Sequence, residues 1–308
     1  MIFVSRPKKG PESLRGSTSH GAIEFNSNKA LFNANPLSRL VFTAYRRADV
    51  KQALYIVFDE KCAYCETRFG ASGDGAVEHY RPKGRFIAEN RPGYWWLAAR
   101  WDNLLLSCQH CNESRGQIIV TPGMTMEEAT RLHRDTLKKP THGKGNQFPI
   151  KGVRRRPKKE DALLIDPTRR DPRKHLYFPP DQGISLAVPR ETPTGPDVYG
   201  LATINVSALN RFRLVRERTG VLMDLRKHVL ELESSLDAAE AAQDQAAKHA
   251  ANTRSTTALA AIAARAAKNR PYSAVAQDLY LRLIEWMRAE RRDGVRLPVP
   301  SLIASNLL

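Results

Sequence analysis

Residues 61–116 read KCAYCETRFGASGDGAVEHYRPKGRFIAENRPGYWWLAARWDNLLLSCQHCNESRG and contain all four cysteines of the 308-residue chain. The cysteines form two C-x-x-C pairs, Cys62 with Cys65 and Cys108 with Cys111. Four thiolates satisfy tetrahedral Zn²⁺ with no open position, so the pattern predicts a structural zinc site that closes a long loop. Four reduced core thiols and two disulfides are the alternatives. Disulfides are disfavoured because the chain shows no secretory segment.

Polar side chains suited to catalysis lie within and beside this loop. Glu78 and His79 are adjacent, and Asn103 and Asn112 flank the second cysteine pair. Histidine is the natural general base near neutral pH, because its unperturbed pKa is about 6.5. Carboxylate and amide oxygens are hard ligands suited to Mg²⁺ or Mn²⁺, which also bind phosphate oxygens. An ordinary surface or core histidine and a turn-capping Asn103 are the simpler alternatives.

The motifs Glu78-His79-x-x-Pro82, Asn103-Leu104 and Cys111-Asn112-x-x-x-Gly116 resemble those of HNH (ββα-metal) endonucleases. More narrowly, KCAYCE, VEHYRPKG, YWWLAARWDNLLLSCQHCN and the downstream LLIDP resemble the HNH subunit of Septu-type anti-phage systems (PtuB) and related retron-associated HNH proteins. The specific motifs cover residues 60–117, and a weaker likeness extends to about residue 218. The resemblance therefore carries the nuclease assignment further than the choice of defence system.

The resemblance implies a role for each member of the cluster. His79 is expected to be the general base, and Glu78 and Asn112 are expected to bind a catalytic Mg²⁺ or Mn²⁺. Asn103 is expected to hold the His79 ring through a hydrogen bond. The chain departs from the commonest pattern in having glutamate at 78 and asparagine at 112, where many HNH enzymes have aspartate and histidine.

The composition indicates a polyanionic partner. Net charge is +17 with pI near 10, and no lipid-binding signature accompanies it, so nucleic acid is favoured over membrane. No run approaches the roughly 18 apolar residues of a membrane span, and we expect a soluble, cytoplasmic protein. The candidate nucleic-acid contacts beside the proposed site are Arg81, Lys83, Arg85 and Arg115.

The hydrophobic pattern predicts the elements around the site. Residues 1–36 are expected to be extended, with a short strand at 2–4, and residues 36–60 to form one or two helices. Strands are expected at 77–80 and 104–107, with a helix from Cys111 onward. Residues 94–101 are expected to form an aromatic helix that packs in the core, with a base-stacking platform as the alternative.

The middle of the chain is more polar. A charged surface helix is expected at 124–139, a buried strand at 163–166, and a hairpin from 175–178 and 184–188. Residues 151–174 carry ten Lys or Arg against four Asp or Glu, which fits either a basic loop or a phosphate-tracking surface.

The C-terminal third is expected to be helical. Apolar residues recur every seven positions from Val215 to Leu236, a spacing typical of a helical hairpin or coiled coil. The alanine-rich stretch 237–270 is expected to turn at 252–257 and to pack on a partner or a second copy. A last amphipathic helix is expected at 274–288, followed by an extended apolar tail.

We therefore expect an α+β protein with two parts. Residues 1–200 form a zinc-stapled ββα-metal (HNH) nuclease domain with its core at 61–117, and residues 201–308 form a helical assembly or partner-binding region. The expected function is metal-dependent hydrolysis of DNA phosphodiesters, gated by an ATPase subunit of the PtuA type, with homo-oligomerisation through the C-terminal helices as a further possibility. A stand-alone restriction or homing-type HNH nuclease and a non-catalytic zinc-dependent nucleic-acid-binding protein are the alternatives.

Overall fold

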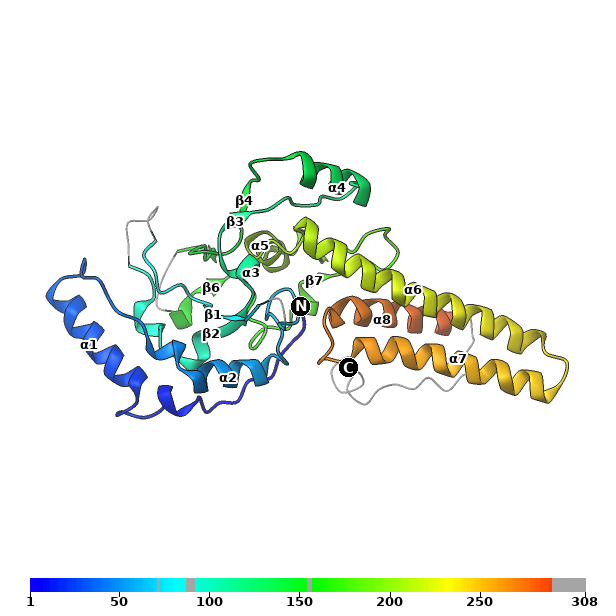
Figure 1. Cartoon of the computed structure of the whole chain (residues 1–308), viewed down its shortest axis with the longest axis horizontal. Helices are drawn as coiled ribbons and strands as arrows, with labels where there is room; N and C mark the ends of the chain where they lie inside the picture. The colour runs from blue at the N-terminus through cyan, green and yellow to red at the C-terminus, as the bar shows by residue number, and fades with distance from the viewer. Residues whose placement is uncertain (71–72, 87–91, 154–156, 290–308) are drawn as a thin grey trace.

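The computed structural model describes residues 1–70, 73–86, 92–153 and 157–289. Within these ranges the fold is α+β, as expected, with eight α-helices and five short two-stranded antiparallel ladders. Figure 1 shows a mixed body built from the N-terminal two thirds, from which the long helices α6 and α7 project side by side. The expected apolar tail after residue 289 lies outside the described residues.

The N-terminal segment contains a helix that the sequence pattern did not predict. Helix α1 (His20–Ala34) replaces the expected extended chain, and Ser19 caps it by accepting a hydrogen bond from the Ala22 amide. Only Gly21 and Asn28 of α1 are buried, so the helix has no apolar period to detect. The expected strand at 2–4 is also wrong. Val4 instead donates one backbone hydrogen bond to Pro167.

The centre of the body is the antiparallel pair of β1 (Ala76–His79) and β2 (Leu104–Ser107), close to the strands expected at 77–80 and 104–107. All four residues of β2 are buried, and helix α2 (Ala48–Val57) packs nearby. Helix α3 (Gln109–Asn112) follows β2. The helix expected from Cys111 onward is wrong: α3 is a single turn that ends at Asn112. The ββα-metal core stays a prediction.

The segment between the two strands is held by aromatic packing. Its aromatic residues form two 3₁₀ turns, η3 (Trp95–Leu97) and η4 (Trp101–Asn103), in place of the single expected helix. Tyr94, Trp95 and Trp101 are buried, so the core-packing interpretation is confirmed. The other 3₁₀ turns are η1 (Glu12–Leu14), η2 (Ala44–Arg46), η5 (Pro157–Lys159) and η6 (Pro172–Lys174).

Short ladders connect the rest of the body. The expected surface helix is α4 (Met126–Asp135), which begins with a capping box between Thr125 and Glu128. Residues 164–166 of the expected strand at 163–166 are buried, but the segment is not a strand. The expected hairpin is confirmed in part by the pairing of β7 with β8. The ladders are β3 (Arg115–Gly116) with β4 (Thr141–His142), β5 (Ile150–Lys151) with β6 (Asp161–Ala162), β7 (Leu176–Tyr177) with β8 (Val188–Pro189), and β9 (Glu191–Thr192) with β10 (Gly195–Pro196).

Four helices end the described chain: α5 (Val198–Val206), α6 (Phe212–Ala241), α7 (Gln245–Ala266) and α8 (Ser273–Ala289). The seven-residue seam of α6 is buried inside the chain, with Leu222, Leu225 and Leu232 fully enclosed. The alanine-rich α7 packs against α6 and α8 (Figure 1). Its expected contact with a partner or a second copy stays a prediction.

The turn of the helical hairpin lies at residues 242–244, where Asp244 caps α7 by accepting from the Ala247 amide. The turn expected at 252–257 is wrong, because the hydroxyls there bond to carbonyls one turn earlier. Thr253 donates to His249 and Thr257 to Thr253, which lets polar residues continue the helix. The expected boundary after residue 200 falls inside α5 and stays a prediction. None of the described helices is long and apolar enough to cross a membrane.

Candidate metal centre and active site

The four cysteines converge on one point. Their Sγ atoms all lie within 4.8 Å of one another, with Cys65 and Cys108 3.7 Å apart, and none forms a disulfide. Cys108 is half-buried and the other three are buried. Four thiolates at this spacing are a donor set for one tetrahedral metal ion, so the residues fit the expected structural metal.

A buried arginine completes the surroundings of the cysteines. Arg211 Nη1 lies 3.4 Å from Cys111 Sγ, and its Nη2 lies 3.7 Å from Cys108 Sγ. Burial lowers the pKa of Arg211, but the charges of Cys111, Cys65 and Cys108 outweigh it and raise that pKa well above its ordinary value. Because Arg211 directly precedes α6, it joins the cysteine centre to the helical part of the chain. It is far from the motifs in sequence, and the sequence analysis missed it.

A second contact ties the helices to the same centre. Glu66, the neighbour of Cys65, is buried and accepts a 2.7 Å hydrogen bond from the Ser273 hydroxyl at the start of α8. Lys61 donates to the Arg270 carbonyl in the loop before α8. The cysteine centre is therefore a junction between the first and last thirds of the described chain.

His79 lies at the end of β1 with one ring nitrogen fixed. Its Nε2 is 3.1 Å from the Ala98 carbonyl oxygen, which only accepts hydrogen bonds, so Nε2 carries the proton. The lone pair is then on Nδ1, 3.3 Å from Lys83 Nζ. The Tyr45 ring packs edge-on against the imidazole, with centroids 4.5 Å apart. The arrangement holds a neutral imidazole with one basic nitrogen.

The surroundings of His79 keep it neutral. The residue is only 5% exposed, and burial, followed by the nearby charge of Lys83, lowers its pKa well below 6.5. A histidine in this state can accept a proton at neutral pH without first losing one.

Asn103 does not make the expected hydrogen bond to His79. Its amide oxygen accepts from the Arg81 backbone amide, and its nitrogen donates to the Arg81 and Leu97 carbonyls. The ring nitrogen is already taken by Ala98, the residue after Leu97. Asn103 thus fastens the segment that carries the Ala98 carbonyl, and it acts on His79 only through that carbonyl.

Glu78 points to a different partner. Its carboxylate Oε1 lies 2.6 Å from Lys144 Nζ, and both side chains are almost fully buried. The same ammonium donates a 3.0 Å hydrogen bond to the His79 carbonyl. Burial raises the pKa of Glu78, and the charge of Lys144 opposes that rise. Lys144 is a residue of the site that the sequence analysis missed.

Lys144 is brought to Glu78 by a short loop docked on α3. The Lys144 amide donates to the Cys111 carbonyl and the Gly145 amide to the Asn112 carbonyl, at 3.0 and 2.7 Å. Gly143 has φ +121°, and a Cβ there would lie 1.9 Å from the Glu113 carbonyl oxygen, so only glycine fits. The loop therefore depends on glycine, and it sets the ammonium between β1 and α3.

The residues expected to bind a catalytic metal fit it less completely than the cysteines fit theirs. Asn112 is half-buried, and its side-chain amide makes no hydrogen bond to another described residue. Its oxygen and the Glu78 carboxylate are suitable donors, but Lys144 already neutralises Glu78. Among the described residues, only the four cysteines bring three or more His, Cys, Asp or Glu ligand atoms together.

The expected DNA-contacting cations have different surroundings. Arg81 is buried, pairs with Glu160, and lies over the Tyr94 and Phe148 rings, so its guanidinium is engaged inside the protein. Arg85 is exposed. Lys83 is half-buried beside His79, and Arg115 is half-buried with a 2.7 Å ion pair to Glu113.

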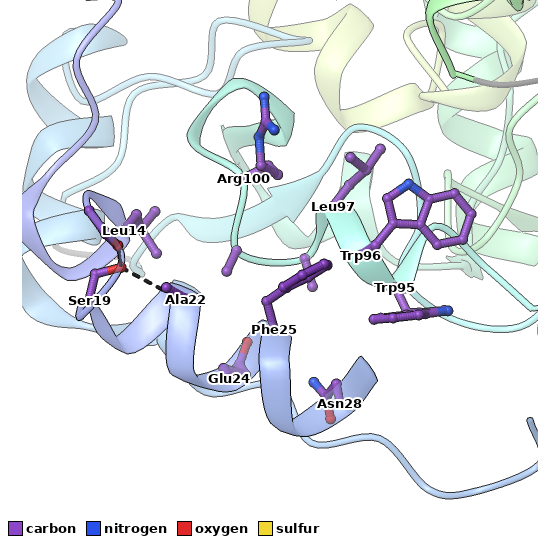
Figure 2. Close-up of a pocket in the computed structure, with 14 residues that line it drawn as sticks. Leu14, Ser19, Ala22, Glu24, Phe25, Asn28, Trp95, Trp96, Leu97 and Arg100 are labelled. Atoms are coloured by element: carbon purple, nitrogen blue, oxygen red, sulfur yellow. Dashed lines mark hydrogen bonds between the residues drawn. The ribbon is translucent and has the colours of Figure 1, made fainter. Parts of the chain in front are cut away.

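An aromatic cavity of about 370 Å³ opens between α1 and residues 95–100. Figure 2 shows the Phe25 side chain reaching from α1 toward Trp95 and Trp96, with Arg100 at the rim. Phe25 and Trp95 stack with centroids 6.0 Å apart. Two polar residues of the wall are already used: Asn28 binds the Val41 backbone, and Glu24 accepts from Thr43 and Ala44. The cavity is thus mainly an apolar packing seam.

Two curated proteins are similar to this chain. The Septu protein PtuB of Bacillus mycoides (strain KBAB4) is 32% identical over 225 residues, which cover 69% of this chain and 64% of that protein. The Septu protein PtuB of Bacillus thuringiensis is 31% identical over 117 residues, or 38% of this chain and 37% of that protein. The chain thus spans less than two thirds of the length of these relatives. No protein-family model matches the chain, and no solved structure matches it.

Proposed function

We propose, from the relationship of this chain to the Septu PtuB proteins, that it is the nuclease subunit of a Septu-type anti-phage system and hydrolyses DNA phosphodiester bonds. The observation that carries the proposal is His79, a buried neutral imidazole whose proton is fixed on Nε2 by Ala98. A neutral imidazole with one basic nitrogen is the state that a general base requires.

In the proposed reaction His79 Nδ1 takes the proton from the attacking water. Lys83 Nζ faces that nitrogen in the structure, so an incoming phosphate that attracts the ammonium frees Nδ1 for the water. The Ala98 carbonyl accepts the hydrogen bond from Nε2–H, which keeps the proton on that nitrogen and the ring from turning. Asn103 holds the Ala98 segment, so its role is positioning.

Two metals are part of the proposal. Zinc is the ion that four thiolates favour, so we assign a structural Zn²⁺ to Cys62, Cys65, Cys108 and Cys111. Glu78 and Asn112 would hold Mg²⁺ or Mn²⁺, which supplies charge neutralisation at the phosphate. Lys144 must leave the Glu78 carboxylate for that ion to bind.

DNA contacts are assigned to cations that can reach a phosphate. Lys83 lies beside His79, and Arg85 and Arg115 lie close to the site in sequence. Arg81 is left out because its charge is buried against Glu160. These cations contribute sequence-independent affinity, which weakens as salt concentration rises.

The partner is proposed to be an ATPase of the PtuA type that gates cleavage. Helix α6 offers an apolar surface for it: Met223 and Leu230 are 49% and 64% exposed and lie seven residues apart, hence on one face. A second copy of the chain is the other occupant to be tested.

The experiment is a phage-protection assay with the two genes expressed together. Wild-type chain should reduce plaque formation, while His79→Ala, with unchanged protein level and zinc content, should not. Purified proteins should then cut plasmid DNA only with a divalent ion present. Protection that survives His79→Ala would remove the nuclease proposal and leave a binding role.

A further inference from the structure

A second cavity, away from His79, lies between the cysteine centre and the start of α6. Its volume is about 260 Å³. Three cationic residues and two histidines line it, and none of its described lining residues is acidic. The cations and histidines that line the cavity are His110, His133, Lys139, Arg211 and Arg213. A cavity whose charged walls all carry one sign attracts an anion.

The two histidines leave polar atoms without partners. His110 Nδ1 and His133 Nδ1 are buried and make no hydrogen bond with any residue that the structure describes. His133 is held in place by stacking on Phe212, with ring centroids 4.6 Å apart and planes 24° from parallel. Both imidazoles are half-buried and line the cavity, so they add neutral polar surface beside its cations.

The three cations differ in how many contacts they already make within the protein. Arg211 is committed to the cysteines, as described above. Arg213, in the first turn of the 30-residue helix α6, is exposed and makes no ion pair with another described residue. Lys139 is half-buried and donates one hydrogen bond, to the Thr136 carbonyl. The helix start adds partial positive charge at the same place.

We propose that this cavity binds a phosphate group, supplied either by a nucleic-acid backbone or by a free nucleotide. Arg213 and Lys139 supply the charge-assisted hydrogen bonds, and the start of α6 adds its partial positive charge. The proposal goes beyond the nuclease function, because it concerns binding at residues that take no part in the His79 chemistry.

The test measures binding of inorganic phosphate to the full zinc-loaded chain by calorimetry. Arg213→Ala and Lys139→Ala should each weaken binding by about tenfold, the loss expected for one charge-assisted hydrogen bond. Arg254→Ala is the matched control, because this exposed arginine of α7 lies outside the lining residues and, like Arg213, makes no ion pair with another described residue. It should leave phosphate affinity unchanged, and all three variants should melt like wild type.

A short oligo-dT strand then identifies the source of the phosphate. If oligo-dT competes with inorganic phosphate in wild type but not in Arg213→Ala, the cavity binds a phosphate of the nucleic-acid backbone. Phosphate and ATP binding without such competition supports a free nucleotide. The proposal is overturned if wild type shows no saturable phosphate binding, or if Arg254→Ala weakens it as much as Arg213→Ala. Because no cleavage is measured, failure of the nuclease proposal cannot produce either result.

Discussion

The Lys144 ammonium lies 2.6 Å from the Glu78 carboxylate, and the two side chains are 1% and 4% exposed. Two opposite charges in a dry environment stabilise each other only while both are present, since removing one leaves an uncompensated buried charge. The pair also links β1 to the loop on α3, because Lys144 hydrogen-bonds to the His79 carbonyl and its amide to Cys111. A cation therefore already neutralises the expected metal ligand.

The first prediction follows from that pair. Lys144→Met should lower the free energy of unfolding by about 3–5 kcal/mol. Added Mn²⁺ should then raise the melting temperature of Lys144→Met but not of the Lys144→Met, Glu78→Gln double variant, because the freed carboxylate accepts the metal.

The matched control is Lys51→Met, which breaks an exposed ion pair with Asp74 of nearly the same length. It should cost no more than about 1 kcal/mol and should not respond to Mn²⁺. A Lys144→Met protein as stable as Lys51→Met would show that the buried pair does not hold the site together.

Lys144 also shows what the sequence could not reveal. Glu78, His79 and the cysteines were found because they stand in short sequence motifs with recognisable spacing. Lys144 follows α3 only after the β3–β4 detour that contains α4, so no short motif connects it to Cys111. Its one local signal is Gly143, whose positive φ is required by the approach to Glu113.

The same reasoning explains the other differences. Strand β2 and the α6 seam were predictable because burial imposes an apolar pattern on them. Helix α1 buries almost nothing and leaves no such pattern. The hydrogen bond expected from Asn103 to His79 is not formed, because a backbone carbonyl, which carries no sequence signal, occupies the His79 nitrogen.

The second prediction concerns the structural metal. Purified protein should contain one Zn²⁺ per chain, and Cys108→Ser should lose the ion and the cooperative melt, since thiolate zinc sites contribute on the order of 10 kcal/mol to folding. Elemental analysis and calorimetry measure both. Ser107→Ala, next to the ligand, serves as the control and should keep the metal. Zinc-free wild type that still melts cooperatively would contradict the assignment.

The third prediction uses the pH dependence of cleavage. Burial and then the Lys83 charge depress the pKa of His79, so wild type should stay active well below pH 6.5. Lys83→Met removes a cation and raises the pKa of His79, so the imidazole is protonated at a higher pH. The acid limb of kcat/KM should therefore move to higher pH.

Arg85→Met separates this effect from loss of a DNA contact. It removes a nearby exposed charge and should lower affinity without moving the acid limb. If the Lys83→Met limb stays where the wild-type limb is, Lys83 does not set the protonation of the base.

The fourth prediction tests the apolar face of α6. Replacing Met223 and Leu230 with glutamate should weaken binding to the proposed ATPase subunit. The free energy of unfolding should stay within about 0.5 kcal/mol of wild type, because both side chains are exposed. Co-purification and analytical ultracentrifugation measure the partner and the oligomeric state. Replacing the buried Leu225 with glutamate instead should unfold the helical hairpin, because that side chain lies in the core. Unchanged association of the double variant with both the ATPase and itself would reject this face as an interface.

The last prediction concerns the base itself. His79→Ala should lower the cleavage rate by about 10²–10⁴, because no other described side chain presents a neutral nitrogen held in place by a backbone carbonyl beside the Glu78 strand. His79→Gln, which keeps the buried volume and the bond to Ala98, should be equally inactive. Zinc content and DNA affinity should stay near wild type in both.

The control is His20→Ala, which changes an exposed histidine at the start of α1 and should cut normally. The assay must include the proposed ATPase subunit, since a gated wild type would otherwise look as inactive as the variants. Wild-type cleavage by His79→Gln under those conditions would place the general base elsewhere.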